Sequence, residues 1–396
     1  MSREDSARIL IIPITFFFIF FGLGSIQPYV IPFLKLKWKF SSLQCSVIMA
    51  VIYFSFGLFR FCAPLIIYYL RSKPTIFLGA SGYLLFVVLL YTLEQYPAFI
   101  AASAMWGLFA AMFWTASSIQ ILDTSEITRY GTWSGVLYFF TKSGVALGVP
   151  FLGFVWSLNG RADAFAGYQD LFRISILVGS IGIALALFVP RLQVEQRKPL
   201  LGDVRKFLFH RGGWVILLLL IVPGLSYGNL LGLINVYIKE TFDESYVGPI
   251  TFFYLATGVL FSYLGGRLSD RFGRRRVFLG SFASGALGAL IMAFTAQPIL
   301  LGLANFLLGV QFGAIPVAAM AWVGDITARG GRPLAHGSVF AGRDLGVGAS
   351  IMISGSFSQL QIGYQETFLT FTAIFLAAAL LSYAYIREPI REGDPK

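Results

Sequence analysis

The chain has 396 residues, of which 57% are hydrophobic, 16% are aromatic and only 12% are charged. A soluble protein cannot bury so much apolar surface, whereas a lipid bilayer accepts it. The composition therefore excludes a soluble domain and indicates an all-α polytopic membrane protein. The net charge of +11 would favour nucleic acid in a soluble protein. Here the basic residues lie mostly between apolar runs, so we expect no nucleic-acid partner.

Six apolar runs of spanning length are followed by a polar stretch and by six more runs. The runs lie at about 9–34, 44–70, 75–93, 98–121, 132–157 and 171–190, and then at 213–238, 249–266, 277–295, 298–323, 334–357 and 367–386. Since about 20 residues cross a bilayer as a helix, the sequence predicts twelve transmembrane helices. We expect two pseudo-symmetric six-helix bundles, at 1–190 and 213–396, joined by a cytoplasmic linker at 191–212.

Lysine and arginine are distributed unevenly between the two sides of this layout. With both termini inside, the inner segments carry 21 of the 30 basic residues and the outer loops carry six. Because basic residues favour the cytoplasmic side, the bias predicts cytoplasmic N and C termini. The outer loops are short and contain no Asn-x-Ser/Thr sequence, which favours a prokaryotic inner membrane.

The stretch between the eighth and ninth runs reads Gly266-Arg267-Leu268-Ser269-Asp270-Arg271-Phe272-Gly273-Arg274-Arg275-Arg276. An arginine at the bilayer centre costs at least ~2.5 kcal/mol, so we expect a basic loop outside the lipid. The spacing G-x-x-x-D-R-x-G-R-R resembles the signature loop of the major facilitator superfamily of transporters. The resemblance implies secondary transport by alternating access. It also implies that the motif's aspartate contacts the positive end of a helix from the other half and latches one conformation.

An internal repeat of about 200 residues agrees with two halves. Residues 126–129 recur as 325–329, and the signature has a decayed partner at 64–73, in which Tyr68 stands where Asp270 does. Pseudo-symmetry therefore places the partner of Asp270 near Thr132 and Trp133. The residues that we expect to form the latch are Gly266, Asp270, Arg271, Gly273, Arg274, Arg275, Glu126, Arg129, Asp325 and Arg329. At the inner helix ends, Asp123, Glu126 and Asp325 are expected to form gate or latch salt bridges.

Ionisable residues inside apolar runs are costly and are therefore functional candidates. Arg60 lies ~16 Å from the inner end of its helix at 1.5 Å per residue. Lys142 and Arg343 lie near mid-membrane, 201 positions apart in the two halves. Arg60 resembles the anion-binding arginine of the family's nitrate porters, although Ser262 replaces the matching arginine of the eighth helix. Arg60 could instead pair helices, and Lys142 and Arg343 could contact Asp344 or helix carbonyls.

Asp344 is the only carboxylate placed well inside a predicted span. It could be the protonation site of a proton-coupled cycle, or it could neutralise a neighbouring cation. Three embedded cations against one acid predict an electropositive cavity. We therefore expect a small anionic solute, such as a carboxylate, a phosphorylated compound or an inorganic anion.

Uncharged residues complete the candidate site. The first, seventh and tenth helices line the cavity in the family, which implies solute contacts for Gln27, Asn229, Asn235 and Gln311. Contacts between helices are an equally open role for these residues. The fifth run carries Gly135, Gly144, Gly148, Pro150 and Gly153, which resembles in part the glycine-proline motif of the family's drug/proton antiporters. Tight helix packing is the favoured role of these glycines. Trp106 and Trp114 could form an aromatic wall or simply pack.

The sequence contains no motif for enzyme chemistry. It lacks GxSxG, HExxH, a Walker loop and a Cys/His cluster, and we place both histidines, His210 and His336, in inner loops. We expect no catalytic residue, no metal site and no cofactor. The predicted function is secondary active transport of a small solute by a monomer in the lipid bilayer. A drug/proton antiporter is the alternative, and a non-transporting membrane scaffold or trafficking protein is the alternative of another class.

Overall fold

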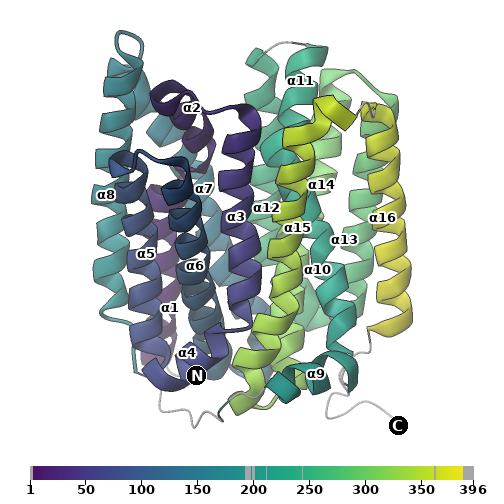
Figure 1. Ribbon diagram of the computed structural model, residues 1–396. Helices are drawn as coiled ribbons and strands as arrows, with labels where there is room; N and C mark the ends of the chain where they lie inside the picture. The colour runs from purple at the N-terminus through teal and green to yellow at the C-terminus, as the bar shows by residue number, and fades with distance from the viewer. Residues whose placement is uncertain are drawn as a thin grey trace.

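The computed structural model describes residues 3–191, 198, 201–210, 212–242, 244–360 and 363–386, and every regular element in these ranges is a helix. The long helices lie side by side with their axes roughly aligned. The first half is on the left of Figure 1 and the second half is on the right. Arg197 and Arg211 of the predicted linker lie outside the described residues, as does the C-terminal end beyond 386. The predicted all-α fold with two halves is confirmed.

The first half contains two interrupted helices and four continuous ones. Its elements are α1 (Arg3–Ile19), η1 (Phe20–Gly24), α2 (Gln27–Trp38), α3 (Ser42–Arg60), α4 (Ala63–Leu70), α5 (Ser72–Thr92), α6 (Tyr96–Thr124), η2 (Ile127–Arg129), α7 (Tyr130–Asn159) and α8 (Ala164–Ala186). α8 begins at Ala164 rather than at the predicted 171, because its first turns are capped by the Asp163 side chain, which accepts a hydrogen bond from the Phe165 backbone N–H.

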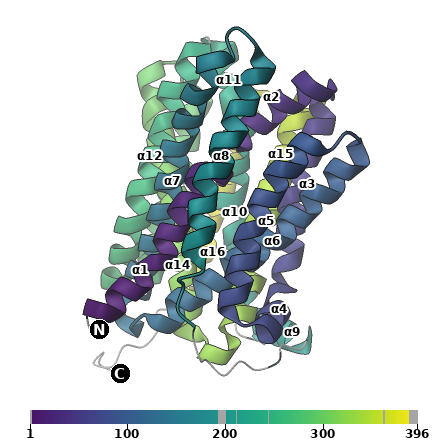
Figure 2. The ribbon, with the colours of Figure 1, turned by 90° about the vertical axis from the view of Figure 1, so that its left-hand side faces the viewer.

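The second half begins with a short linker helix. Its elements are α9 (Leu201–His210), α10 (Gly213–Asn229), η3 (Leu230–Ile234), α11 (Asn235–Thr241), α12 (Glu244–Phe272), α13 (Arg274–Phe294), α14 (Pro298–Ile326), η4 (Arg329–Gly331), α15 (Arg332–Leu360) and α16 (Tyr364–Tyr385). α4 and α9 lie at one end of the molecule and α2 and α11 at the other (Figure 2). The predicted division of the chain at 190 and 213 stays a prediction.

Among the described residues, eleven helices are long and apolar enough to cross a membrane. α15 is the twelfth span of the predicted layout. It has 29 residues, packs against α3 and α10 and runs the length of the molecule beside them (Figure 1). It is less apolar than the others because it contains Arg343, Asp344 and His336. His336 is fully buried in this helix, so its predicted place in an inner loop was wrong.

The signature stretch is not a loop, which corrects the expectation from its charge. α12 continues to Phe272, Gly273 alone breaks the helix with φ of 94°, and α13 begins at Arg274. The prediction failed because charged residues must leave the lipid but need not leave the helix. The helix extends beyond the apolar run, and the turn needs one residue whose φ suits glycine.

The same break occurs in the first half, between α4 and α5. Arg71 has φ of 68° and ψ of 167°, a region that is essentially restricted to glycine and costs other residues about 1–3 kcal/mol. Arg71 and Gly273 are 202 positions apart. The two breaks therefore share one geometry, although only the second half keeps the glycine that the geometry suits.

We predict that Arg71→Gly stabilises the protein by about 1 kcal/mol, because glycine adopts this backbone conformation without strain. Thermal unfolding of the purified protein in detergent measures the effect as a rise in Tm. Arg71→Ala is the control, since it removes the same charge but keeps the strain. A Tm that rises equally in both variants would show that the charge, and not the backbone, limits stability.

Candidate functional site

A central cavity of about 80 Å³ lies between the two halves. Of its seventeen lining residues in the described part of the chain, nine are aromatic. They are Phe20, Tyr53, Phe56, Tyr83, Trp106, Trp114, Tyr138, Tyr227 and Phe312. The first and seventh spans are each interrupted by a π-helical turn, at η1 and η3. Such turns are frequent at functional sites, and η1 contributes Phe20 and Gly24 to the cavity wall.

Lys142 reaches into this cavity from α7. Its Nζ donates a hydrogen bond to the Phe312 carbonyl oxygen at 2.6 Å and lies 4.0 Å from the centroid of the Phe312 ring. The ring face partly replaces water around the ammonium group. Among the described residues, no carboxylate lies within ion-pair distance of Lys142. Its ammonium group therefore contacts a carbonyl oxygen and a ring rather than an acid.

Asp344 on α15 binds two arginines. Arg60 Nε from α3 donates to Asp344 Oδ2, and Arg343 Nη1 lies 3.4 Å from Oδ1. The side chains of Arg60 and Asp344 are fully buried. The Arg60 guanidinium also lies 4.3 Å from the centroid of the Phe56 ring. The formal charges of these three groups sum to +1, and the electropositive cavity stays a prediction.

The structure brings some of the predicted binding residues together and leaves others apart. Gln27, Lys142 and Arg343 line the central cavity, and Gln27 Oε1 accepts a hydrogen bond from Tyr53 at 2.9 Å. The predicted residues that do not line it are Arg60, Asn229, Asn235 and Gln311. Asn229 accepts from Ser350 and Gln311 donates to Ser226, each at 2.7 Å. These two side chains thus make the interhelical contacts that the sequence left open, and their role in binding stays a prediction.

The sequence prediction included two of the cavity's rings, Trp106 and Trp114, and missed the other seven. Tyr83, Tyr138 and Tyr227 are not distinguished from the other tyrosines by any local pattern. A cation four residues further along the same helix was the one available signal, and it marks Tyr138, before Lys142, and Phe56, before Arg60. The other rings line the cavity because of the way each helix is oriented about its own axis, which the sequence does not indicate.

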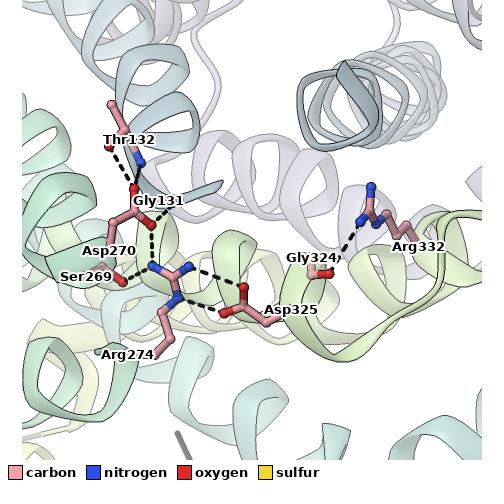
Figure 3. A network of polar contacts seen from close by, with 8 residues as sticks. All are labelled: Gly131, Thr132, Ser269, Asp270, Arg274, Gly324, Asp325 and Arg332. Carbon is pink, nitrogen blue, oxygen red and sulfur yellow. Dashed lines mark hydrogen bonds and ion pairs between the residues drawn. The ribbon is translucent and has the colours of Figure 1, made fainter. Parts of the chain in front are cut away.

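Asp270 binds the first turn of α7 (Figure 3). Its carboxylate accepts from the backbone N–H of Gly131 at 2.9 Å and of Thr132 at 2.6 Å, and from Thr132 Oγ1 at 2.7 Å. The start of a helix carries partial positive charge, which favours an anion there. The predicted contact with Thr132 is present, whereas Gly131 takes the place expected for Trp133.

Arg274 joins Asp270 to a second acid. Its Nη1 donates to Asp270 Oδ1 at 2.7 Å, and its Nε donates to Asp325 Oδ2 at 2.8 Å (Figure 3). All three side chains are largely buried. Arg274 therefore links the end of α12 to the end of α14 while Asp270 links α12 to α7.

Glycines allow α7 and α12 to approach until their backbones touch. A Cβ added to Gly131 would lie 2.5 Å from the Gly266 carbonyl oxygen, and one added to Gly135 would lie 2.6 Å from that of Ser262. No larger residue fits at these positions without a shift of backbone. The close contact brings the α7 N-terminus within reach of Asp270, and the favoured packing role of Gly135 agrees with it.

The other inner charges are arranged differently from the predicted repeat. Glu126 and Arg129 form an exposed ion pair of 3.6 Å. Asp123, not Glu126, is the structural counterpart of Asp325. Both are the penultimate residues of 29-residue helices, α6 and α14. The expected salt bridge of Asp123 is present, with Arg332 at 2.6 Å. The sequence match was shifted because it followed the loop after the helix rather than the helix end.

The remaining latch candidates lie around this network. Arg271 and Arg275 stack near rings, at 5.1 Å from the Phe272 centroid and 4.1 Å from that of Tyr383. Arg329 is exposed in η4. Their participation in a latch stays a prediction.

We predict unequal costs for removing the charges around Asp344. Asp344→Leu leaves two buried arginines without their acid and should destabilise by about 3–5 kcal/mol, the usual cost of breaking a buried pair from one side. Arg60→Met should cost less, because Asp344 keeps Arg343. Thermal unfolding in detergent compares the two variants. Equal losses, or a larger loss in Arg60→Met, would contradict the sharing of one carboxylate by two arginines.

Comparisons with known proteins agree with this architecture. The family model described as Major Facilitator Superfamily matches residues 13–245 and 216–396. The class H tetracycline resistance protein of Pasteurella multocida is 28% identical over 182 residues, which are 44% of this chain and 44% of that protein. Multidrug resistance protein MdtG of Klebsiella pneumoniae (strain 342) is 24% identical over 335 residues, covering 80% of this chain and 77% of its own.

Solved structures show the same fold. The human organic anion transporter MFSD10 (TETRAN) superposes with a TM-score of 0.78 at 16% identity, over 96% of this chain and 100% of its own. FucP, a Major Facilitator Superfamily transporter in the outward conformation, gives 0.75 at 14% identity, over 97% and 100%.

Proposed function

This chain belongs to the Major Facilitator Superfamily, and we propose that the solute it carries is a small organic anion. The protein is an integral membrane transporter and not an enzyme. The observation that carries the proposal is the lining of the central cavity, where Lys142 and Arg343 are the charged side chains and no carboxylate is among the described lining residues.

Charge and ring content together narrow the class of solute. Two cations in a low-dielectric site focus a positive potential, which favours an anion. The aromatic walls offer apolar area and stacking faces, which an organic body uses and an inorganic ion does not. Among the anions expected from the sequence, a carboxylate or a phosphorylated compound fits both features. The human relative named as an organic anion transporter shares the fold and is consistent with this class.

The cavity must widen before such a solute can enter. Its volume of about 80 Å³ is well below the roughly 300–1,000 Å³ of typical ligand pockets. Alternating access supplies the wider state, in which one side of the molecule opens. At the end of the molecule that we propose to face the cytoplasm, Asp270 binds α7 and Arg274 binds Asp325. We therefore propose that this conformation is closed toward the inner side and that solute binds after rearrangement.

Asp344 is proposed as the site of proton coupling. An anionic solute that binds Arg343 competes with Asp344 for the same guanidinium group. Protonation of Asp344 would release both of its arginines and strengthen the pull of Arg343 on the solute. The two events therefore favour each other, which is the requirement for coupled movement of a proton and an anion.

Drug/proton antiport is the second candidate, because the curated relatives are named as tetracycline and multidrug resistance proteins. An aromatic cavity also suits amphipathic drugs. The positive lining distinguishes the candidates, since it disfavours cationic drugs. A scaffold or trafficking role would be supported if a protein partner, and no solute, stabilised the purified chain.

We propose a prokaryotic inner membrane as the location, with both termini in the cytoplasm and a monomer as the working unit. α1 begins and α16 ends at the end of the molecule where α9 lies (Figure 1). Basic residues are concentrated in the segments at that end, and such segments favour the cytoplasm.

The role of Lys142 can be measured directly. A thermal-shift screen of the purified protein against anionic, neutral and cationic metabolites should identify stabilising anions. Uptake of such an anion into proteoliposomes should fall about tenfold or more in Lys142→Gln, since a charge-assisted hydrogen bond contributes about 1.5–3 kcal/mol. Lys142→Arg should keep more activity, and Lys206→Gln, on the exposed face of α9, is the matched control. Stabilisation by cations alone, or full anion uptake by Lys142→Gln, would refute the proposal.

The latch proposed for Asp270 has a separate test. Asp270→Asn removes the charge that α7 and Arg274 bind, so we predict a shift toward the inward-open state. A cysteine at Ser134, which is fully buried on α7, should label faster in this variant when the native cysteines are absent. Solute binding, measured by thermal shift, should persist. Loss of binding with unchanged labelling would show that Asp270 serves the site rather than the latch.

A further inference from the structure

The first half lacks counterparts of Asp270, which binds α7, and of Arg274, which binds Asp325. Arg71 and Gly273 mark equivalent helix breaks, with ψ of 167° and 160°. The same offset of 202 positions places Tyr68 opposite Asp270 and Ser72 opposite Arg274. The decayed signature therefore has neither the acid that binds α7 nor the arginine that binds Asp325.

The loss of the arginine leaves a structural problem at Asp123. Its counterpart Asp325 is held by Arg274 from the same half. Asp123 is 3% exposed, and Ser72 cannot supply a charge to it. A buried carboxylate that has lost its partner costs several kcal/mol, so this position requires a cation from elsewhere.

Arg332 supplies that cation from the other half of the molecule. Its Nη1 donates to Asp123 Oδ1 at 2.6 Å and to the Leu122 carbonyl oxygen at 3.1 Å, and its Nη2 donates to the Tyr130 hydroxyl group. Nη2 also approaches the Gly324 carbonyl oxygen at 3.5 Å (Figure 3). The guanidinium group therefore binds α6, α7 and α14 at once, and its side chain is 5% exposed.

The position of Arg332 in its own helix does not account for its presence. It is the first residue of α15, where the partial positive charge of a helix N-terminus disfavours a cation by about 0.3–1 kcal/mol. The equivalent end of α7 receives the carboxylate of Asp270 instead. The contact with Asp123 is the feature of the site that offsets this cost.

We propose that Arg332 closes the inner side of the first half in place of the arginine that the decayed signature lacks. Asp270 holds the second half to α7, and Arg332 holds α15 to the end of α6. The inner side is then closed by two kinds of contact. One is a carboxylate on a helix N-terminus, and the other is an ion pair. The pair of Arg332 and Asp123 must separate when the molecule opens inward. This role goes beyond the proposed solute and rests only on alternating access.

The test is a double-mutant cycle read by cysteine labelling from the inner side. The probe is a cysteine at Ser338, which is 1% exposed on α15, in protein without native cysteines. Arg332→Gln and Asp123→Asn should each raise the labelling rate about tenfold, and the double variant should exceed neither. Non-additivity is the mark of two residues that act as one contact. Additive effects, or unchanged rates in both single variants, would overturn the proposal.

A rescue variant tests whether Arg332 replaces the lost arginine. Ser72→Arg, added to Arg332→Gln, places an arginine where Arg274 stands in the other half, so it should restore the Tm that Arg332→Gln loses by pairing Asp123 again. The labelling rate should stay raised, because this pair lies within the first half and does not hold α15. Ser72→Gln is the matched control and should not rescue. If Ser72→Arg does not raise the Tm of monodisperse protein, the replacement is refuted, and a labelling rate that returns to that of the parent would refute closure by Arg332.

A second variant and a second cysteine probe distinguish opening of the inner side from misfolding. If Arg332→Gln is not recovered folded, Asp123→Asn decides, because it keeps the side-chain shape and removes only the charge; unchanged labelling in it would refute the contact. A cysteine at Ser46, buried at the outer end of α3, should label no faster in any variant, whereas unfolding would raise labelling at both probes. No solute is needed, so a wrong solute class leaves this result unaffected.

Discussion

The carboxylate of Asp344 binds two arginines from different halves of the molecule, and much of the central arrangement depends on this sharing. A buried charge needs an opposite charge or hydrogen-bond partners. Arg60 is neutralised by Asp344 and lies outside the cavity lining. Arg343 shares the same acid at a longer distance and still faces the cavity. Lys142 has a carbonyl oxygen and a ring instead of an acid. The two cations that face the cavity are thus the two least neutralised ones.

The features that depend on composition and on charge along the chain could be predicted from the sequence. The helices follow from apolar runs, and the contact between Asp270 and Thr132 follows from the repeat. What could not be predicted is the rotation of each helix about its axis. α5, α6 and α14 are apolar on all faces, so no stripe indicates which side meets the cavity. Gln27 lines the cavity and Gln311 does not, although the sequence offered both equally.

Helix ends were the other limit of the sequence prediction. Charge marks where a chain leaves the lipid, whereas a helix ends where its backbone can turn. At Gly273 the two points differ by several residues, and the signature is mostly helical. The same reasoning explains Asp123. The loop residues after the two helices are similar in sequence, but the structurally equivalent positions are the penultimate residues of α6 and α14. Structural equivalence, and not the sequence match, indicates which acid needs a partner.

α15 connects the cavity to the inner closure. It carries Arg332 at its first residue and Arg343 and Asp344 three turns deeper. Glycines hold it in backbone contact with both neighbours, because a Cβ at Gly337 would overlap the Arg60 carbonyl group on α3 and one at Gly346 would overlap that of Ile221 on α10. A helix packed so closely cannot bend around one end without moving the other. We infer that a change in the partners of Arg343 moves Arg332 as well, so that solute in the cavity and closure of the inner side act on one rigid element.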